Sequence, residues 1–290
     1  MNSIFTFPGI GTTWTIDTPV PLSDHTRAAI LDAVERFDRT YSRFRADSLV
    51  SEIAHAEAGG RFAVPADDEP LFALYDRLWN VTDGAVDPTV GRALELLGYD
   101  ARYSLTPVDA PPPPDRPSWR RDVRRRGVLL ETKRPLVIDV GAAGKGYLVD
   151  KIVALLQQQG VHDAVVDGSG DLRHAGGPPI RVGLEHPQHP TRAIGVVELA
   201  GRSLCASSSN RRAWGTGLHH ILDARTGAPT RAVTATWVLA PDAATADGIA
   251  TALFFTPPAR IQTDFDVEWV RMLADGRVQW SDNFSGELFV

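Results

Sequence analysis

Residues 138–150 read IDVGAAGKGYLVD, and this stretch decides which fold the rest of the chain is expected to form. The apolar segment 136–138 predicts a strand that ends at Asp139, and the Gly and Ala residues at 141–144 predict a tight turn. A helix is expected from Lys145 to Gly160, because apolar residues recur there at helical spacing. The free N–H groups and positive dipole at the start of such a helix attract phosphates. The stretch therefore predicts an anion-binding turn.

A phosphate-binding P-loop is excluded by two positions of this turn. That motif requires Gly about six residues before the Lys and Ser or Thr directly after it. The chain has Asp139 and Gly146 at these positions. An ordinary strand-to-helix connection with a solvated Lys145 remains the alternative at this point.

The composition is that of an ordinary globular protein. The 290 residues are 43% hydrophobic and 23% charged, which suits one large domain or two lobes. A net charge of -6 gives no electrostatic footprint for nucleic acid or an anionic membrane. Cys205 is the single Cys, so an internal disulfide framework and a Cys-based metal site are excluded. Because the N-terminus does not read as a secretory signal and no apolar run approaches the ~18 residues of a membrane span, we expect a cytoplasmic protein.

The remaining chain predicts a mixture of helices and strands. A hairpin is expected from 4–7 and 14–16, and a second one from 128–130 and 136–138. Helices are expected to begin at Ser23 or Asp24 and at Asp67 or Asp68, with short and late helices at 89–97 and 242–255. Further strands are expected at 164–166, 180–184, 195–199, 203–206, 233–239, 269–273 and 278–280. The Arg residues of 120–126 are expected to form a solvated face, and residues 106–118, which include Pro111–Pro114, are expected to form an exposed loop or linker.

Two segments of the first half have both a ligand-binding and a structural interpretation. Phe44 lies among polar residues of 41–54, a pattern that suits a nucleotide site and also a helix-capping turn. Asp87 precedes Pro88 and is therefore expected to be extended, not helical. Its carboxylate is placed either to accept hydrogen bonds from a ligand or to cap a helix, and both can hold together.

Asp247 and Thr251 stand four residues apart in the helix expected after Pro241. Side chains at that spacing share one face of a helix. A carboxylate and a hydroxyl are hard oxygen ligands that suit Mg²⁺. The alternative is that Thr251 bonds its own helix backbone and that Asp247 is solvated.

The segment HHILD, 219–223, contains two adjacent His residues and one Asp. In a regular strand, alternation would place His219 and Asp223 on one face and His220 on the other. This segment lies in a polar stretch, 207–230, which is rich in hydroxyls and Gly and has the character of a functional loop.

Taken together, four motifs in this order resemble the ApbE family, the FAD:protein FMN transferases. They are GAVDPTVG, IDVGAAGKGYLVD, HILDARTGAP and ADGIAT, and the earlier segment YSRFRADSLVSEI is also similar to that family. The resemblance extends from about residue 11 to about residue 255. It implies an ApbE-like α+β fold, with mixed or antiparallel sheets packed by helices in two lobes and the flavin site between them. We expect a single domain over residues 1–290, with lobes at about 1–135 and 136–290.

The resemblance also implies a reaction and a set of residues. Such an enzyme is Mg²⁺-dependent, cleaves FAD, moves FMN onto a Ser or Thr hydroxyl of an acceptor flavoprotein and releases AMP. The implied metal ligands are the backbone carbonyl of Ala142 with Asp247 and Thr251. His220 is the implied acid–base residue, with Asp223 beside it. The implied FAD contacts are Phe44, Ala85, Val86, Asp87, Asp139, Lys145 and Ile221.

The chain departs from the family pattern at several turns. Gly144 stands where the family usually has Ala, Ala224 replaces the Pro of the D-P-R-T-G motif, and residues 206–208 read ASS in place of Thr-Ser-Gly. A usual Gly-Gly is here Gly168-Ser169. None of these changes removes a residue implied to bind the metal or the flavin, so flavin binding stays expected. They leave open which protein is the acceptor. The rival interpretations are an FAD pyrophosphatase that gives FMN and AMP, and a flavin-binding protein without turnover.

Overall fold

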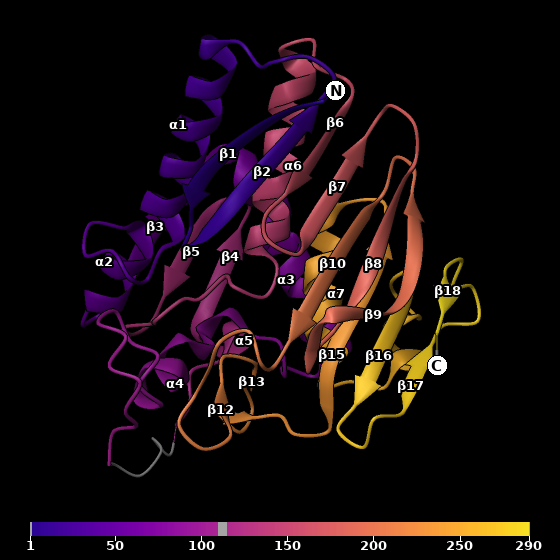
Figure 1. Ribbon diagram of the computed structural model, residues 1–290. Helices are drawn as coiled ribbons and strands as arrows, with labels where there is room; N and C mark the ends of the chain where they lie inside the picture. The colour runs from indigo at the N-terminus through magenta and orange to yellow at the C-terminus, as the bar shows by residue number, and fades with distance from the viewer. Residues whose placement is uncertain (1, 110–114, 290) are drawn as a thin grey trace.

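The computed structural model describes residues 2–109 and 115–289, and its main element is an eight-stranded sheet (Figure 1). Every pair of neighbouring strands in it is antiparallel. Across the sheet the order is β1 (Ser3–Gly9), β2 (Thr12–Thr18), β6 (Ala164–Asp167), β7 (Asp171–Ala175), β10 (Ser203–Ser208), β15 (Val233–Ala240), β16 (Glu268–Leu273) and β17 (Val278–Trp280). The sheet therefore joins strands from both sides of residue 135.

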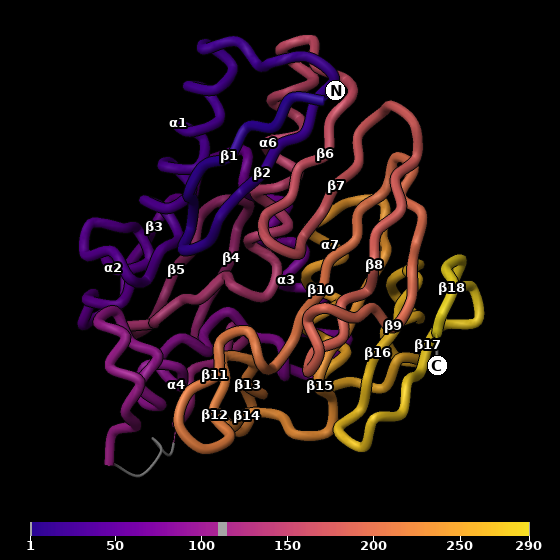
Figure 2. The backbone as a smooth tube through the Cα atoms, viewed as in Figure 1, coloured from indigo at the N-terminus to yellow at the C-terminus, as the bar shows by residue number. Residues whose placement is uncertain are grey.

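Helices pack against one face of this sheet (Figures 1 and 2). They are α1 (Asp24–Tyr41), α3 (Glu69–Thr82), α6 (Gly144–Gln158) and α7 (Ala243–Ala252). The expected start is confirmed for α1, where the Ser23 side chain accepts a hydrogen bond from the Thr26 N–H. The expected end is confirmed for α6, which Gly160 follows with a φ of 78°. The apolar stripe of α6 is buried as its spacing predicts. This layer and the sheet share one core that draws on both halves of the chain.

A smaller sheet covers the other face of β10, β15 and β16. It consists of β8 (Ile180–His186), β9 (His189–Leu199) and β18 (Glu287–Leu288). Side chains of β15 alternate between the layers: Trp237 and Leu239 join the core under the small sheet, whereas Val238 and Ala240 join the core under the helices. The continuous apolar run of β15 is explained by burial on both faces.

Short elements complete the described chain. They are α2 (Leu49–His55), α4 (Gly91–Leu96), α5 (Trp119–Asp122), α8 (Pro258–Ile261), the 3₁₀ turns Ala66–Asp68 and Pro88–Val90, the sheet of β3 (Gly60–Ala63), β5 (Leu129–Thr132) and β4 (Val123–Arg126), and the hairpins β11 (Ala213–Trp214) with β12 (Leu218–His219) and β13 (Leu222–Asp223) with β14 (Ala228–Pro229). Pro111–Pro114 lie outside the described residues. No helix in the ranges 2–109 and 115–289 is long and apolar enough to cross a bilayer.

The α+β prediction is confirmed, but one predicted hairpin is wrong. Residues 136–138 are buried and extended yet belong to no strand, and β5 pairs instead with β3 and β4. The chain directly after this segment is hydrogen-bonded to a turn and not to a strand, because the Asp139 N–H donates to the Pro88 carbonyl at 2.8 Å. Part of the basic run forms β4, where Arg125 pairs with Asp76 at 2.6 Å and only its neighbours keep the expected exposed position.

Candidate active site

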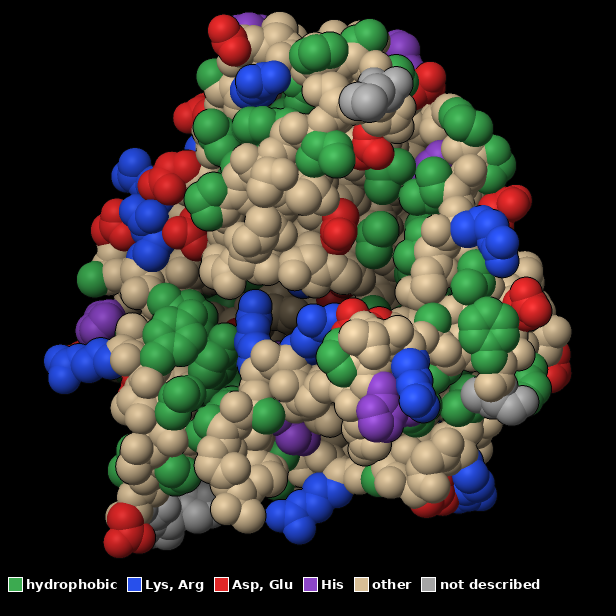
Figure 3. All heavy atoms as spheres, in the orientation of Figure 1, with side chains coloured by type: hydrophobic (Ala, Val, Ile, Leu, Met, Phe, Trp, Pro, Cys, Tyr) green, Lys and Arg blue, Asp and Glu red, His purple; other side chains and the backbone are tan. Residues whose placement is uncertain are grey.

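A cavity of about 510 Å³ opens between the helical layer, the main sheet and the polar loop 207–230. The space-filling view shows a hollow in the middle of this face, with charged side chains at its edge (Figure 3). Volume of this size is typical of ligand sites. Ten of the residues implied by the sequence line it: Ala85, Val86, Asp87, Asp139, Ala142, Lys145, His220, Ile221, Asp247 and Thr251.

The turn before α6 forms one wall of the cavity. The Gly141 N–H donates to the Asp139 carboxylate at 2.7 Å, and Arg43 forms an ion pair with the other oxygen of that carboxylate at 2.6 Å. Burial by itself raises the pKa of Asp139, but the charge of Arg43 and these hydrogen bonds outweigh it, so the pKa lies below its ordinary value. Asp139 is therefore a fixed anion that shapes the turn, and its carboxylate is already paired with Arg43 before any ligand binds.

A close approach of α6 and α7 brings the late helix to this turn. The Gly146 N–H donates to the Asp247 carboxylate at 3.0 Å. A Cβ added at Gly146 would lie 2.1 Å from the carbonyl oxygen of Ala243, so only Gly fits there. The absence of a side chain at Gly146 thus lets the two helices approach each other at this contact.

Asp150, one turn further along α6, fixes the start of α7. Its carboxylate accepts hydrogen bonds from the backbone N–H of Ala243 at 3.0 Å and of Ala244 at 2.9 Å, and it also pairs with Arg173. A carboxylate at a helix N-terminus satisfies free donors and favours the helix dipole. Asp150 thus acts as a second clamp between the two helices.

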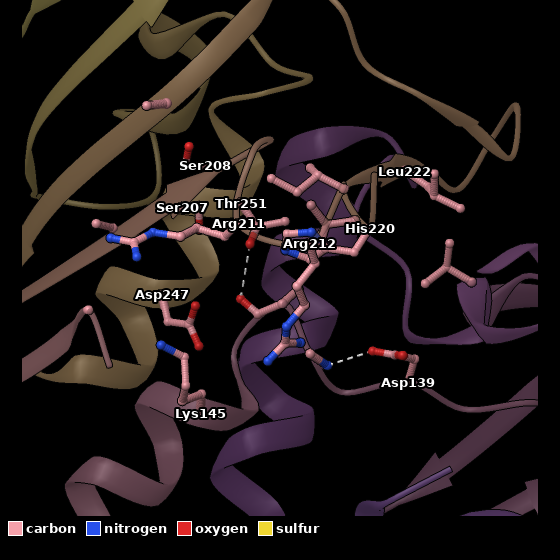
Figure 4. A pocket seen from close by; sticks show the side chains of 18 of the residues that line it. Asp139, Lys145, Ser207, Ser208, Arg211, Arg212, His220, Leu222, Asp247 and Thr251 are labelled. Atoms are coloured by element: carbon pink, nitrogen blue, oxygen red, sulfur yellow. Dashed lines mark hydrogen bonds between the residues drawn. The ribbon is translucent and has the colours of Figure 1, made fainter. Parts of the chain in front are cut away.

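The three implied metal ligands converge. The Thr251 hydroxyl lies 3.4 Å from the Ala142 carbonyl oxygen, and Asp247 stands one turn earlier on the same helix (Figure 4). Two oxygens bound at about 2.1 Å to one octahedral Mg²⁺ are about 3 Å apart, so this separation fits after a small contraction. No three His, Cys, Asp or Glu side chains gather as a metal site anywhere in the described residues, so the donor set here depends on a hydroxyl and a main-chain oxygen.

A buried group of charges lies beside these oxygens. Lys145 pairs with Asp171 at 2.8 Å, and Asp171 is only 1% exposed. Burial first, and then the negative charge of Asp171, raise the pKa of Asp247 well above its ordinary value, while Lys145 opposes the shift. A divalent cation beside Asp247 would offset the burial and the repulsion by Asp171 that disfavour its charged form.

Asp171 was not singled out from the sequence. It follows the turn Asp167-Gly168-Ser169-Gly170 and begins β7, so its carboxylate resembled an ordinary turn residue. The pattern that could have identified it is a lone acidic residue at the inner end of a buried strand. Its two oxygens have no hydrogen-bond partner among the described residues apart from the ion pair with Lys145.

The two adjacent His residues separate into one structural and one cavity residue. His219 is buried, and its ring contacts the Thr230 carbonyl at 2.8 Å through Nε2. The β-strand alternation that would have joined His219 to Asp223 fails, because β12 and β13 are separate two-residue strands. His220 lines the cavity, and its Nδ1 has no partner in the described chain. Burial and the neighbouring charge of Arg212 lower the pKa of His220 to about 4, so the ring is neutral at pH 7.

Two Arg residues at the cavity mouth were also missed by sequence reasoning. Arg211 pairs with Glu185 at 2.8 Å, whereas Arg212 forms no ion pair with any described residue. In the close-up, Arg212 extends into the space between Asp247 and Asp139 (Figure 4). A guanidinium free of carboxylate partners in a cavity is suited to a phosphate. These residues belong to the polar loop, which the sequence marked only as a whole.

Three residues implied by the resemblance are occupied by contacts within the protein. Asp223 is not among the residues that line the cavity, and its carboxylate pairs with Arg225 at 2.6 Å, a contact that shapes the turn; its implied catalytic role stays a prediction. Asp87 adopts the predicted extended conformation, but its carboxylate accepts hydrogen bonds from the Thr89 N–H and hydroxyl, the Trp79 ring and the Trp119 N–H. The helix-cap interpretation accounts for that side chain, and the Asp87 carbonyl accepts a further hydrogen bond from the Val90 N–H.

Phe44 also lies outside the cavity lining. Its ring is stacked against Tyr103 at 5.0 Å and lies 4.2 Å from the guanidinium of Arg43. A flavin that stacks on Phe44 therefore has to displace Tyr103, which is 51% exposed. The cap in the same segment is Ser48, whose side chain accepts a hydrogen bond from Ser51 N–H.

Comparisons with known proteins agree on one family. A model described as the ApbE family matches residues 10–266. The FAD:protein FMN transferase of Vibrio cholerae is 30% identical over 85% of this chain and 79% of that protein, and the one from Escherichia coli K12 is 24% identical over 87% and 77%. The ApbE protein of Thermotoga maritima superposes with a TM-score of 0.84 at 26% identity over 98% of each chain. The flavin transferase ApbE of Vibrio cholerae gives a TM-score of 0.84 at 24% identity over 98% of each chain, a similarity of fold.

Proposed function

The chain belongs to the ApbE family, and we propose that it transfers FMN from FAD to a Ser or Thr hydroxyl of an acceptor protein and releases AMP. Its relatives named FAD:protein FMN transferase supply the reaction class. The single observation that carries the proposal is the 3.4 Å approach of Thr251 to the Ala142 carbonyl, beside Asp247, at the wall of a cavity large enough for a nucleotide.

The residues present fit a hard divalent cation. Ala142, Asp247 and Thr251 offer only oxygen donors, and the unbalanced charge of Asp171 and Asp247 favours an added positive charge. A Mg²⁺ ion held there would polarise the pyrophosphate of FAD and stabilise the departing AMP.

The chain itself supplies further positive field at the phosphates. The Arg212 guanidinium lines the cavity, and Lys145 adds a half-buried positive charge beside it. Asp171 is the positioning residue that holds Lys145 at this place. We assign the flavin and its ribityl chain to the walls formed by Ala85, Val86, Ile221, the paired Asp139 and the main chain of Asp87, with Phe44 as a stacking partner once Tyr103 moves aside.

His220 is the proposed general base. Its unpartnered Nδ1 and lowered pKa leave a neutral ring that accepts the proton of the acceptor hydroxyl. The acceptor oxygen forms a bond to the phosphorus on the riboflavin side, the bridging P–O bond breaks, and the bridging oxygen leaves with AMP. Atoms and charge balance when His220 passes its proton to solvent.

Mass spectrometry tests this function directly. The protein is incubated with FAD, Mg²⁺ and co-expressed acceptor fragments, and an FMN adduct on Ser or Thr with matching AMP release is expected. AMP and free FMN without an acceptor would identify a pyrophosphatase instead. Tight binding of FAD with no AMP released would identify a storage protein.

A further inference from the structure

Tyr75 is a buried residue of the cavity that no step above uses. It lies on α3, is 0% exposed and belongs to the cavity lining. Its hydroxyl has no hydrogen-bond partner among the described residues. Because leaving a buried hydroxyl unpaired is unfavourable, each such group in a native protein requires a reason.

The surroundings of Tyr75 locate its hydroxyl at the cation turn. Burial, followed by the negative charges of Asp139 and Asp247, raises the pKa of Tyr75 well above its ordinary value, and the backbone N–H groups of Ala143 and Ala142 oppose that shift. Asp139, Ala142 and Asp247 all line the cavity. The helix α3 meets α7 here, since a Cβ on Gly248 would lie 2.8 Å from Leu78, one turn after Tyr75. Tyr75 therefore shares this wall of the cavity with Asp139, Ala142 and Asp247.

We propose that Tyr75 is an additional substrate-binding residue, whose hydroxyl donates a hydrogen bond to a phosphate oxygen that FAD brings to the turn at Ala142. The inference rests on the proposed function. A neutral phenol is suited to this position, because it adds a donor beside two carboxylates without adding a charge. The partner missing from the protein is then supplied by the ligand, as is common for polar groups that fix a ligand's orientation.

A second buried tyrosine provides a matched control. Tyr41 is 4% exposed, and its hydroxyl donates to the Asp68 carboxylate at 2.8 Å, away from the cavity lining. Substitution by Phe removes one oxygen in each case and keeps the ring. At Tyr41 the change breaks a satisfied hydrogen bond, whereas at Tyr75 it removes an unsatisfied group.

The experiment compares Tyr75→Phe and Tyr41→Phe with the wild type. Thermal unfolding is measured without ligand, and the Kd values for FAD and riboflavin are measured by flavin fluorescence with Mg²⁺. For Tyr75→Phe we expect an unchanged or higher Tm, FAD binding weakened about tenfold or more, and unchanged binding of riboflavin, which has no phosphate. For Tyr41→Phe we expect a lower Tm and unchanged affinities.

The outcomes separate this inference from the proposed function. If the wild type binds FAD and releases AMP while Tyr75→Phe binds FAD with wild-type affinity, the inference fails and the proposed function stands. A lowered Tm of Tyr75→Phe with equal weakening of FAD and riboflavin overturns it as well, because the hydroxyl is then structural. If the wild type does not bind FAD, both the inference about Tyr75 and the proposed function are wrong.

Discussion

Substitution of Gly146 by Ala tests the geometry of the two helices most sharply. The added Cβ would lie 2.1 Å from the Ala243 carbonyl oxygen and 2.8 Å from the Cβ of Asp247. Because a carbon and an oxygen in ordinary contact are more than 3 Å apart, α7 has to retreat by about 1 Å. Such overpacking costs about 1–3 kcal/mol of stability. A displacement of about 1 Å at a catalytic group reduces turnover about 10²-fold.

The assay measures AMP release from FAD at saturating Mg²⁺, with Tm recorded in parallel. The control is Gly160→Ala at the other end of α6, about 20 Å away. Gly160 has a φ of +78° and nothing within 4 Å of an added Cβ, so Ala there costs about 1 kcal/mol of backbone strain without moving α7. Both variants are expected to lose stability, and only Gly146→Ala is expected to lose turnover. Gly146→Ala with AMP release within about twofold of wild type would refute the reasoning.

Three further predictions concern single side chains. Asp247→Asn keeps an acceptor for the Gly146 N–H but removes the carboxylate charge that Asp171 repels. We therefore expect a Tm without ligand at or above that of the wild type, together with loss of Mg²⁺-dependent AMP release. A retained rate of AMP release counts against the metal assignment. Because the pKa of His220 is about 4 in the folded protein against an ordinary 6.5, the group contributes stability that is complete above pH 6.5 and is lost as the pH falls toward 4. His220→Gln should therefore flatten the fall in Tm between pH 6.5 and 4. The acid limb of kcat should lie near pH 4, and an acid limb near pH 6.5 would contradict the account. Arg212→Met should weaken FAD binding about tenfold and leave riboflavin binding unchanged, as measured by flavin fluorescence, and equal losses for both ligands would place Arg212 away from the phosphates.

The periodic parts of the fold were readable from the sequence. The helix α6 follows from the apolar spacing after Lys145 and from Gly160, and the spacing of Asp247 and Thr251 placed both on one helix face. These features depend on local geometry alone. That the helix face meets Ala142 depended on the family resemblance, because no local rule brings residues more than a hundred positions apart together.

The errors have a common cause in tertiary contacts. The segment 136–138 has the composition of a strand, but it pairs with no neighbouring strand, and the backbone directly after it is hydrogen-bonded to Pro88. Asp87 had both a ligand-binding and a helix-capping interpretation, and Asp223 had an implied catalytic role beside His220. Trp119 and Arg225 contribute the partners that their carboxylates bind in the fold. Such pairings depend on which surfaces meet.

The site residues that were missed share a different cause. Asp171, Arg212 and Tyr75 occur in patterns with an ordinary structural meaning, namely a turn, a basic loop and an apolar helix face. Tyr75 and Arg212 are distinguished by polar groups without a partner among the described residues at the cavity wall, and Asp171 by a buried carboxylate paired with Lys145. These features appear only after folding.

Anomalous diffraction from a crystal grown with FAD and Mn²⁺ would test, independently of turnover, whether one cation binds between the turn before α6 and the helix α7. The account predicts a single strong peak within coordination distance of the Ala142 carbonyl, the Asp247 carboxylate and the Thr251 hydroxyl, with a pyrophosphate oxygen completing the shell. A peak elsewhere in the cavity, or FAD bound with its phosphates away from this turn, would contradict it.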